Sequence, residues 1–428
     1  MGAGTLRDFH SEASRLDAED PLRELRREFL LPEGVIYLDG NSLGPLTRGG
    51  LARLEAAIAD WRRLAVGGWQ GAETPWFHLA ETLGDLLGEV VGAERGELVA
   101  TAQTTLNLHQ LLQTFYRPAP GRAAVLADEL AFPSDLYAIR SHLELRGLDP
   151  TEHLRLVPSR DGQTLDEADV LAALRDDVAL AVLPGVLYRS GQLLPIPAIT
   201  AEAHRHGVRV AWDLSHAAGA VPLDLHRDDV DFAFFCTYKY LCGGPGAIGA
   251  LFVHRRHLPV APGMAGWFGS EKRRQFDMAA ELAPASDAGV LQVGTPPVLS
   301  AVPLLGSLPI FREVGAKALR SRSLRQTGFL IDLAQELLSD LGFRVATPRE
   351  PERRGGHVAL EHPEAARLCR ALKDQGVVPD FRPPGLVRLG PHPLYTTFAE
   401  IAQAVEVLRD IARSGAHLAY PREREEIG

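Results

Sequence analysis

The sequence predicts an α/β protein in which a largely parallel sheet is followed by a smaller α+β region. Near-continuous apolar runs recur through the middle of the chain, and such runs suit strands that are buried on both faces. Helix-like segments separate most of these runs, which is the pattern of βαβ units. After about residue 310 the pattern changes to long amphipathic helices and short strands.

The elements of the first region follow from apolar runs for the strands and from a three-to-four-residue apolar spacing for the helices. One pair of strands, joined through Gly243 and Gly244, is expected to be antiparallel because its connection is too short for a crossover. We predict strands at 123–128, 153–159, 178–188, 208–213, 231–238 and 247–254, and helices at 165–177 and 197–207.

The second region is predicted to hold helices at 323–342, 362–376 and 398–415, with strands at 342–348 and within 377–390. Just before it, residues 288–311 carry no formal charge, but prolines interrupt them. We therefore predict an interior loop and a buried helix start there, not a membrane span. The predicted divisions are an N-terminal arm and helix joined to the small domain (1–60), a large domain (61–310) and a small domain (311–428).

Composition narrows the classes of partner. The 428 residues are 46% hydrophobic and 23% charged, as in globular proteins, and the net charge of −10 disfavours nucleic acid or an anionic membrane. The arginine pairs at 273–274 and 353–354 are predicted to be solvated loop charges. Three cysteines are too few for a disulfide framework, which favours a cytoplasmic location, and no Cys/His set has the spacing of a zinc site.

Lys239 raises the question of function, because it lies in the apolar stretch FFCTYKYLCGGPGAIGALFVH (234–254) between two predicted strands. Burying an unpaired ammonium is costly. The lysine therefore reaches solvent, pairs with a carboxylate, or serves chemistry that needs a desolvated amine, such as Schiff-base formation. Taken alone, the residue leaves these alternatives open.

A second stretch, VAWDLSHAAGA (210–220), lies one βα step upstream and favours the chemical alternative. Asp213 ends an apolar run, and ligands gather where parallel strands end. A carboxylate there can keep a heterocyclic nitrogen protonated, as pyridoxal phosphate requires. Taken singly, Asp213 could be a helix cap and His216 a buried structural histidine. Asp-x-x-His followed by a strand and Tyr-Lys is more specific than its parts.

This combination resembles the fold-type-I pyridoxal-phosphate enzymes of the aminotransferase class V-like group, and over about residues 25–415 the chain is similar to the kynureninase family. The resemblance implies a mostly parallel seven-stranded sheet flanked by helices in a large cofactor-binding domain, with a smaller C-terminal α+β domain. The matching stretches are YLDGNSLGPL (37–46), TTLNLHQLL (104–112), FPSD (132–135), LPGVLYRSGQ (183–192), WDLSHAAGA (212–220), TYKYLCGGPGA (237–247), GWFG (266–269), GTPPVLS (294–300) and VRLGPHPLYTTF (387–398).

The resemblance also implies roles for matched residues. Lys239 would carry the cofactor and then act as a general acid and base, Asp213 would hold the pyridine proton, and Tyr238 would place its hydroxyl near the phosphate. Further implied cofactor contacts are Thr104, Thr105, which precede the helical NLHQLLQTF, and Phe132, Pro133, Ser134, Asp135, His216, Trp267 and Thr295.

Trp267 and Thr295 match residues that reach the phosphate from the neighbouring subunit, which implies a homodimer with its active site at the interface. Arg388 would bind the substrate α-carboxylate as a two-pronged donor. The other implied substrate contacts are Asn41, Tyr188 and Trp69.

The implied reaction is hydrolysis of the Cβ–Cγ bond of L-kynurenine to anthranilate and L-alanine, in tryptophan catabolism or NAD biosynthesis. Cys242 and Ser270 replace an Asn and a His that are common in the family. Trp69 and Gln70 stand where animal members carry a His for the 3-hydroxylated substrate, and Gly294–Thr295 replaces their Ser-Asn. These departures favour L-kynurenine over 3-hydroxykynurenine, whose product would be 3-hydroxyanthranilate.

Two alternatives stay open. One is another class V enzyme, an aminotransferase or a cysteine desulfurase-like lyase. A desulfurase needs a reactive cysteine on a mobile loop, whereas Cys369 is predicted to be buried in a helix, and Cys236 and Cys242 to flank the lysine in strands. The other alternative is a non-catalytic regulatory protein, which should lack the lysine or the aspartate or carry a DNA-binding module.

Overall fold

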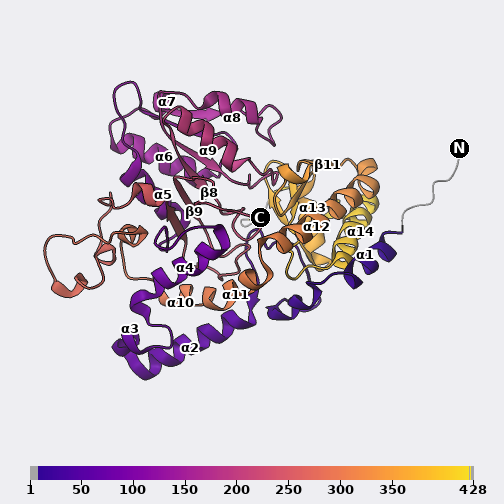
Figure 1. The fold of residues 1–428 in the computed structure, drawn as a ribbon. Coiled ribbons are helices and arrows are strands. Elements are labelled where there is room, and N and C mark those ends of the chain that lie inside the picture. The colour runs from indigo at the N-terminus through magenta and orange to yellow at the C-terminus, as the bar shows by residue number, and fades with distance from the viewer. Residues whose placement is uncertain (1–7, 424, 426–428) are drawn as a thin grey trace.

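A computed structural model describes residues 8–423 and residue 425, so the predicted divisions 1–60 and 311–428 each include a few residues outside the described part (Figure 1). Within that part, the central sheet has seven strands in the order β4-β10-β9-β8-β7-β5-β6, and β10 alone runs against the others. The predicted fold class is confirmed. The strands are β4 (Leu98–Ala100), β5 (Ala124–Asp128), β6 (Leu154–Val157), β7 (Val178–Pro184), β8 (Arg209–Asp213), β9 (Phe232–Phe235) and β10 (Ala250–Val253).

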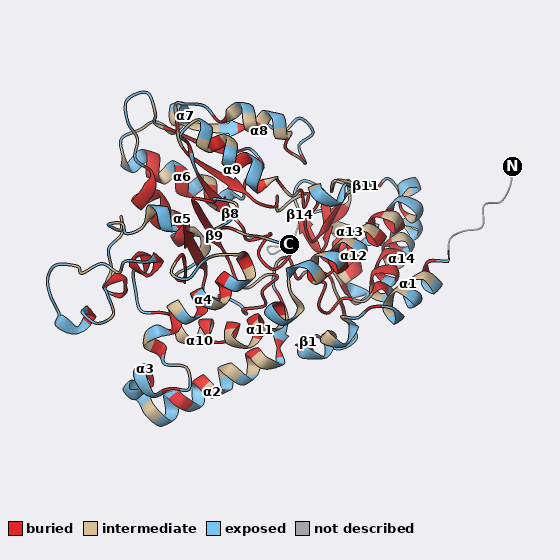
Figure 2. Cartoon of the chain, in the orientation of Figure 1, coloured by how far each residue is buried: buried red, intermediate tan, exposed pale blue. Residues whose placement is uncertain are grey.

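Helices cover both faces of this sheet, and the strands are buried between them (Figure 2). In β9, Phe232 and Phe234 face one apolar cluster while Ala233 and Phe235 face the other, because successive side chains point to opposite faces. The first cluster includes α5 (Thr104–Phe115) and α6 (Pro133–Leu145); the second includes α4 (Leu79–Val91), α9 (Ile196–Arg205) and α11 (Leu304–Val314).

Several elements are shorter than predicted, and two of them show the reason. The helix expected at 165–177 is α8 (Glu167–Ala173), which begins after Asp166 because that side chain caps the Ala168 amide. The strand expected at 231–238 ends at Phe235, since the chain then folds back through a Gly243 amide bond to the Thr237 carbonyl. Lys239 and both neighbouring cysteines, Cys236 and Cys242, therefore lie in the β9–β10 loop and not in strands. The antiparallel pairing of β9 with β10 is confirmed.

The second region forms a four-stranded antiparallel sheet in the order β11-β12-β15-β14, packed against long helices (Figure 1, right). The N-terminal helix α1 (Phe9–Ala18) packs on α14, whereas α2 (Arg48–Leu64) packs on α11 of the large region. The division at residues 60 and 310 stays a prediction. The elements are β11 (Arg344–Val345), β12 (Val358–Glu361), β14 (Asp380–Arg382), β15 (Leu386–Leu389), α12 (Ala316–Leu337), α13 (Ala365–Asp374) and α14 (Phe398–Ser414).

Short elements connect these parts of the molecule. Of two small strand pairings, β1 with β3 lies within the N-terminal arm, and β2 with β13 ties that arm to the second region. They comprise β1 (Phe29–Leu30), β2 (Ile36–Tyr37), β3 (Leu46–Thr47) and β13 (Val377–Val378); the short helices are α3 (Gly68–Gly71), α7 (Pro150–His153) and α10 (Val298–Ala301).

The segment before the second region is only partly interior. Leu304 and Leu308 of α11 are buried as predicted, but residues 293–295 are exposed, so the prediction of an interior loop is wrong there. Two prolines at 296–297 prevent regular structure, and the chain runs over the surface before α10. Within the described residues, no single helix is long and apolar enough to cross a membrane; Val298–Val314 and Ala316–Leu337 satisfy that test only as a pair bent by 85°.

The pair Arg353–Arg354 was predicted to be solvated, and for Arg354 this is wrong. Its side chain is buried because its Nε donates to Thr327 Oγ1 at 2.9 Å and its other nitrogens reach main-chain carbonyls. The adjoining backbone joins the two regions: the Leu193 amide donates to the Arg353 carbonyl at 2.9 Å, and the Gly355 amide to the Gly191 carbonyl at 2.7 Å.

Candidate active site

A cavity of about 180 Å³ opens where β8 and β9 end, and both regions of the chain line it. This is the edge at which open parallel sheets collect ligands. Its lining residues are Asn41, Ser42, Thr104, Thr105, Phe132, Ser134, Asp135, Tyr188, Asp213, Ser215, His216, Tyr238, Lys239, Arg382 and Arg388.

Lys239 and Asp213 line the same cavity although they come from different segments. Asp213 is the last residue of β8, and one of its oxygens accepts the Ser215 amide at 2.9 Å. Lys239 Nζ lies 2.9 Å from His216 Nε2 and 6.0 Å from the centre of the Phe132 ring. The amine, an acid and an aromatic face therefore surround one space, as the sequence predicts for these residues.

Two helices begin at this cavity. Thr104 and Thr105 were expected to precede a helix, but they are the first two residues of α5, and no side chain caps its first turn. In α6, Pro133 occupies the first turn, with Ser134 and Asp135 after it, while Pro133 itself does not line the cavity. Uncapped amides at a helix start favour a phosphate group. This donor set, with the amine and the carboxylate, fits pyridoxal phosphate.

Burial changes the charge states around the cavity. It raises the pKa of Asp135 well above its ordinary value, and the nearby Asp213 charge adds to the effect. Burial and then the Lys239 charge lower the pKa of His216 well below its ordinary value. Burial and then Cys236 raise the pKa of the Tyr238 hydroxyl. All three shifts favour the uncharged form of the group.

Arg388 is fully buried and is held by an ion pair with Asp380, which lies opposite it on β14. It also donates to the Tyr188 carbonyl, and its Nη2 donates to Ser42 Oγ at 3.3 Å. Arg382 shares the same carboxylate, with Nη2 3.3 Å from Asp380 Oδ1. Two guanidinium groups therefore face the cavity around one acid.

The sequence analysis missed four of these residues: Ser42, Ser215, Arg382 and the supporting Asp380. The charges of DFRPPGLVR (380–388) stand at the two ends of a predicted hairpin, and this pattern could have indicated the Asp380–Arg388 pair. Nothing in the local pattern marks the two serines.

Asn41 is buried without exposed surface, and neither atom of its amide has a hydrogen-bond partner among the described residues. Leaving such an amide unpaired costs about 1–3 kcal/mol for each group, so buried amides are normally satisfied. Because Asn41 lines the cavity, a ligand there would supply the missing partners.

Three predicted site residues lie away from this cavity. Trp69 and Thr295 line a separate, mainly apolar groove of about 490 Å³ with Trp61, Trp76 and residues 296–300. Trp267 is 46% exposed, and its indole donates to the Gln275 carbonyl at 3.0 Å. Their roles at the site stay predictions.

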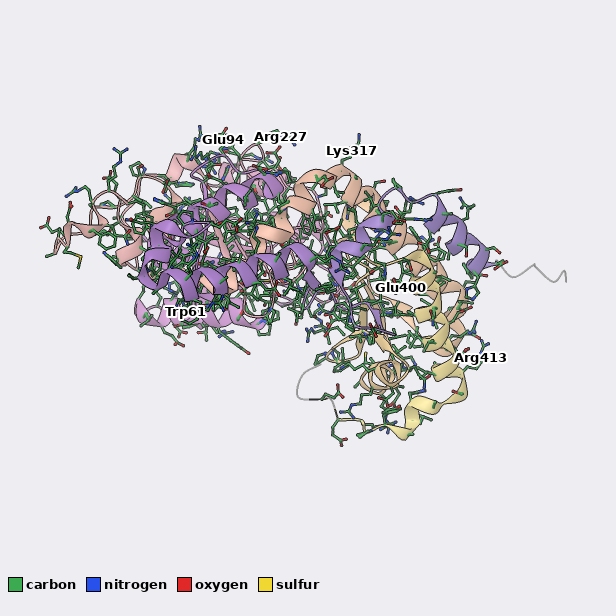
Figure 3. All side chains as sticks on the ribbon, turned by 90° about the horizontal axis from the view of Figure 1, so that it is seen from below. Trp61, Glu94, Arg227, Lys317, Glu400 and Arg413 are labelled. Carbon is green, nitrogen blue, oxygen red and sulfur yellow. The ribbon has the colours of Figure 1, made fainter. Side chains whose placement is uncertain are left out.

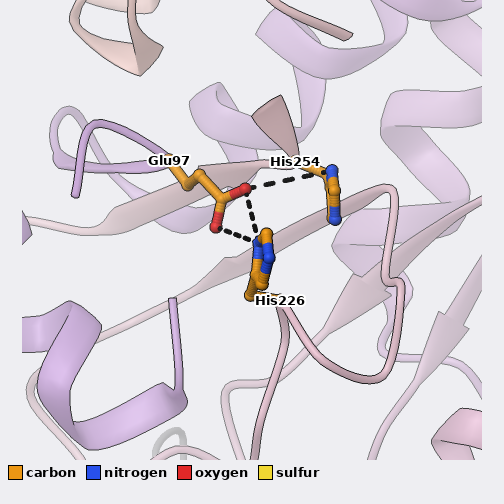
Figure 4. Close-up of side chains that lie close together, drawn as sticks. All are labelled: Glu97, His226 and His254. Carbon is orange, nitrogen blue, oxygen red and sulfur yellow. Dashed lines mark hydrogen bonds and ion pairs between the residues drawn. The ribbon is translucent and has the colours of Figure 1, made fainter. Parts of the chain in front are cut away.

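A second polar cluster lies at the opposite edge of the sheet (Figure 4). Glu97 accepts from His226 Nδ1 at 2.9 Å and from the Arg255 amide at 2.9 Å. His254 stacks on His226 at 4.8 Å, and its Nδ1 accepts the Arg256 amide. Glu97 and His254 also accept hydrogen bonds from backbone amides, and these bonds and ion pairs make the cluster a connected polar network.

The chain is similar over its whole length to known proteins. Residues 319–408 match the family model of the kynureninase C-terminal domain. A kynureninase from Geobacillus thermodenitrificans (strain NG80-2) is 48% identical, with 100% of each chain covered. A kynureninase from Bacillus anthracis is 48% identical, with 97% of each chain covered.

Solved structures share the fold at lower identity. The cystine C–S lyase C-DES, in complex with cysteine persulfide, has a TM-score of 0.77 at 21% identity, covering 88% of this chain and 98% of its own. The cysteine desulfurase of Thermococcus onnurineus NA1 has a TM-score of 0.77 at 18% identity, covering 91% and 98%. A C-DES variant with glycine covalently linked to the PLP cofactor has a TM-score of 0.78 at 20% identity, covering 90% and 99%.

Proposed function

The chain belongs to the kynureninase family, and from that premise we propose that it hydrolyses L-kynurenine with pyridoxal phosphate as its cofactor. Water divides across the Cβ–Cγ bond: the hydroxyl joins the acyl carbon, which leaves as anthranilate, and a proton joins Cβ, which leaves as L-alanine. The observation that carries this proposal is the joint presence of Lys239, Asp213 and Arg388 in one cavity.

When bound, pyridoxal phosphate supplies an electron sink for the carbanions formed at the substrate. Lys239 would hold the cofactor and move protons at Nζ, and Asp213 would keep a proton on the ring nitrogen. The amides of Thr104 and Thr105 at the start of α5 would hold the phosphate, with the Tyr238 hydroxyl as a further donor. The ring of Phe132, which is exposed, would stack on the cofactor.

The substrate is oriented from the opposite wall. Arg388 and Arg382 bind the α-carboxylate, and Asp380 fixes their planes so that little side-chain entropy is lost on binding. Asn41 supplies its unpaired amide to the substrate, and Tyr188 packs edge-on to Phe132 at 5.2 Å, which narrows the entrance for an aryl group.

Lys239→Ala provides the first test. Wild-type protein reconstituted with pyridoxal phosphate should show a visible absorption band and should release fluorescent anthranilate and alanine from kynurenine. Lys239→Ala should lose the band and at least 10³-fold in kcat/KM. Lys317→Ala, on an exposed part of α12, is the matched control and should change neither (Figure 3).

The same assay separates the alternative activities. An aminotransferase would need a keto-acid acceptor, so anthranilate release without one contradicts that alternative. A desulfurase would need an accessible thiol, whereas Cys236, Cys242 and Cys369 are all buried. Absence of both the band and anthranilate in the wild type would overturn the proposed function.

The proposal extends to a homodimer whose partner completes each site. Trp61 of α2 is 59% exposed and lines the apolar groove (Figure 3), and Trp267 and Val293 are also exposed. Exposed aromatic groups around an apolar groove suit a protein interface. A second copy seated there would bring Trp267 and Thr295 to the phosphate of its partner.

Complementation tests the shared site. In a mixed dimer of Lys239→Ala and Trp267→Ala chains, one site carries both defects and the other carries neither. Two inactive preparations should therefore recover about a quarter of wild-type activity when they are unfolded and refolded together. A monomer mass of 46.5 kDa in solution, or no recovery, would contradict the shared site.

Two finer expectations accompany the proposal. The departures at Trp69 and Gln70 favour L-kynurenine over 3-hydroxykynurenine, which a ratio of kcat/KM values for the two substrates measures. A cytoplasmic location agrees with three buried, unpaired thiols, which a reducing compartment preserves.

A further inference from the structure

His357 is a buried histidine behind the site that the reaction described above does not use. It precedes β12 in the second region and has no exposed surface. Its ring centre lies 5.5 Å from that of His216, with the planes inclined at 58°. His216 in turn reaches Lys239, so three basic side chains stand in a row from the cavity into the second region.

The hydrogen bonding of this row is incomplete. His216 Nε2 lies 2.9 Å from Lys239 Nζ, but within the described part of the chain His216 Nδ1 and both nitrogens of His357 have no hydrogen-bond partner. The carbonyls of Tyr188 and Arg189 lie beside the His357 ring at geometries short of a hydrogen bond. Leaving buried polar groups unpaired is unfavourable, so small ring rotations that pair them are favoured.

Burial and the surrounding charges together set the protonation of both rings. Lys239, Arg388 and Arg382 are the charged groups that act on His216, and Arg388 and Lys239 act on His357. Burial first, and then these cations, lower the pKa of both imidazoles well below the ordinary value. Each ring is therefore neutral and offers one N–H donor and one lone pair.

A neutral His216 that accepts a proton from Lys239 through Nε2 must carry its own proton on Nδ1, and that N–H needs an acceptor. A centre-to-centre distance of 5.5 Å leaves room for a hydrogen bond of about 2.9 Å between the two rings. His357 can accept at one nitrogen while its other N–H turns to the Tyr188 or Arg189 carbonyl. Every buried group in the row then has a partner.

We propose that His357 is a positioning residue: it accepts the Nδ1–H of His216 and so fixes the Nε2 lone pair on Lys239. This inference rests on the proposed function, because the state of the lysine nitrogen matters through the cofactor that it carries. The backbone contacts of Gly355 with Gly191 and the Thr347 hydroxyl bond to the Ser190 carbonyl set where His357 stands. Seating of the second region thereby sets the environment of Lys239.

The pH titration of the cofactor absorption band tests the proposal in the reconstituted enzyme. In His357→Leu, the Nδ1–H of His216 has no acceptor, so His216 can carry its proton on Nε2, which faces Lys239. A proton on the lysine nitrogen then has no lone pair of His216 to bond to. The midpoint of the titration should fall by about one pH unit. His357→Gln, whose amide oxygen can accept the same bond, should restore the midpoint to within about 0.3 unit of the wild type. His142→Gln, at a buried histidine of α6 outside the cavity, should match the wild type.

Unchanged midpoints in both His357 variants would overturn the inference while leaving the proposed function intact; failure of the wild type to bind cofactor would instead overturn the proposed function. If His357→Leu does not fold, nitrogen-15 spectra of histidine-labelled wild-type holoenzyme decide, with His216→Gln assigning the signal. The Nδ1–H tautomer at His216 supports the proposal, and the Nε2–H tautomer contradicts it.

Discussion

Two buried aspartates at opposite edges of the central sheet carry opposite pKa shifts. Asp128 ends β5 at the edge of the cavity, and burial raises its pKa from 3.8 to about 7. Its Oδ2 has no partner within the described residues. Asp231 precedes β9 at the other edge; burial raises its pKa, but hydrogen bonds from His204 and His257 outweigh that and lower it overall. His204 Nε2 lies 2.9 Å from Asp231 Oδ2, and His257 Nε2 lies 2.7 Å from Asp231 Oδ1.

The two edges of the sheet differ in whether their buried polar groups have hydrogen-bond partners. At the edge where the strands begin, the carboxylates of Glu97 and Asp231 are paired with histidines, arginines and amides, which stabilises the chain by itself. At the edge where they end, Asn41, Asp128 and His216 keep unpaired atoms. Unpaired buried groups cost stability, so the second edge is arranged for a ligand and the first for folding.

The largest expected effect is a loss of activity, and it concerns the edge of the sheet where the strands end. Asp213→Ala should lower kcat/KM for kynurenine by about 10³-fold, because the carboxylate proposed to hold the ring proton is lost. The thermal midpoint without cofactor should change little. Anthranilate fluorescence measures the rate, and a loss below tenfold would mean that Asp213 only caps the following turn.

The next effect is a loss of stability, and it concerns the edge of the sheet where the strands begin. Asp231→Ala removes the acceptor of four donors, the Val210 amide and the side chains of His204, Arg256 and His257. It should lower the free energy of unfolding by about 3–5 kcal/mol. Urea unfolding measures the change, with the exposed Asp410→Ala as control. In the wild type this contribution is present above pH 4 and is lost as the pH falls through the lowered pKa. If Asp231→Ala left the urea midpoint unchanged and greatly lowered kcat, this edge would serve activity and not folding.

The smallest effect has the opposite pH dependence. The raised pKa of Asp128 means that its contribution to stability is present below pH 4 and is lost as the pH rises through about 7. Asp128→Asn keeps the acceptor for the Leu130 amide without the charge. The free energy of unfolding of the variant should therefore rise relative to that of the wild type between pH 4 and 7. Above pH 7 the variant should remain about 2–4 kcal/mol more stable. If the free energies of unfolding of the variant and the wild type differed by the same amount at pH 4 and at pH 8.5, this prediction would be wrong.

Much of the fold could be predicted because strand and helix patterns are local. Strands buried on both faces give continuous apolar runs, which predicted six of the seven strands of the central sheet and the antiparallel β9–β10 pair. The edge strand β4 has only three residues and no such run. Capping and loop closure shortened α8 and β9, and these depend on contacts that periodicity does not reveal.

The sequence alone determined the class of fold, the position of Asp213 at a strand end and, through its motifs, the family. The tertiary structure alone decided that Arg382 and Asp380 join the site, that Arg354 is buried, and that His357 stands behind His216. The physical reason is distance along the chain. His216 and His357, and Arg388 and Tyr188, come from separate regions of the chain and meet only when those regions pack. The burial that follows sets which side chains keep a charge.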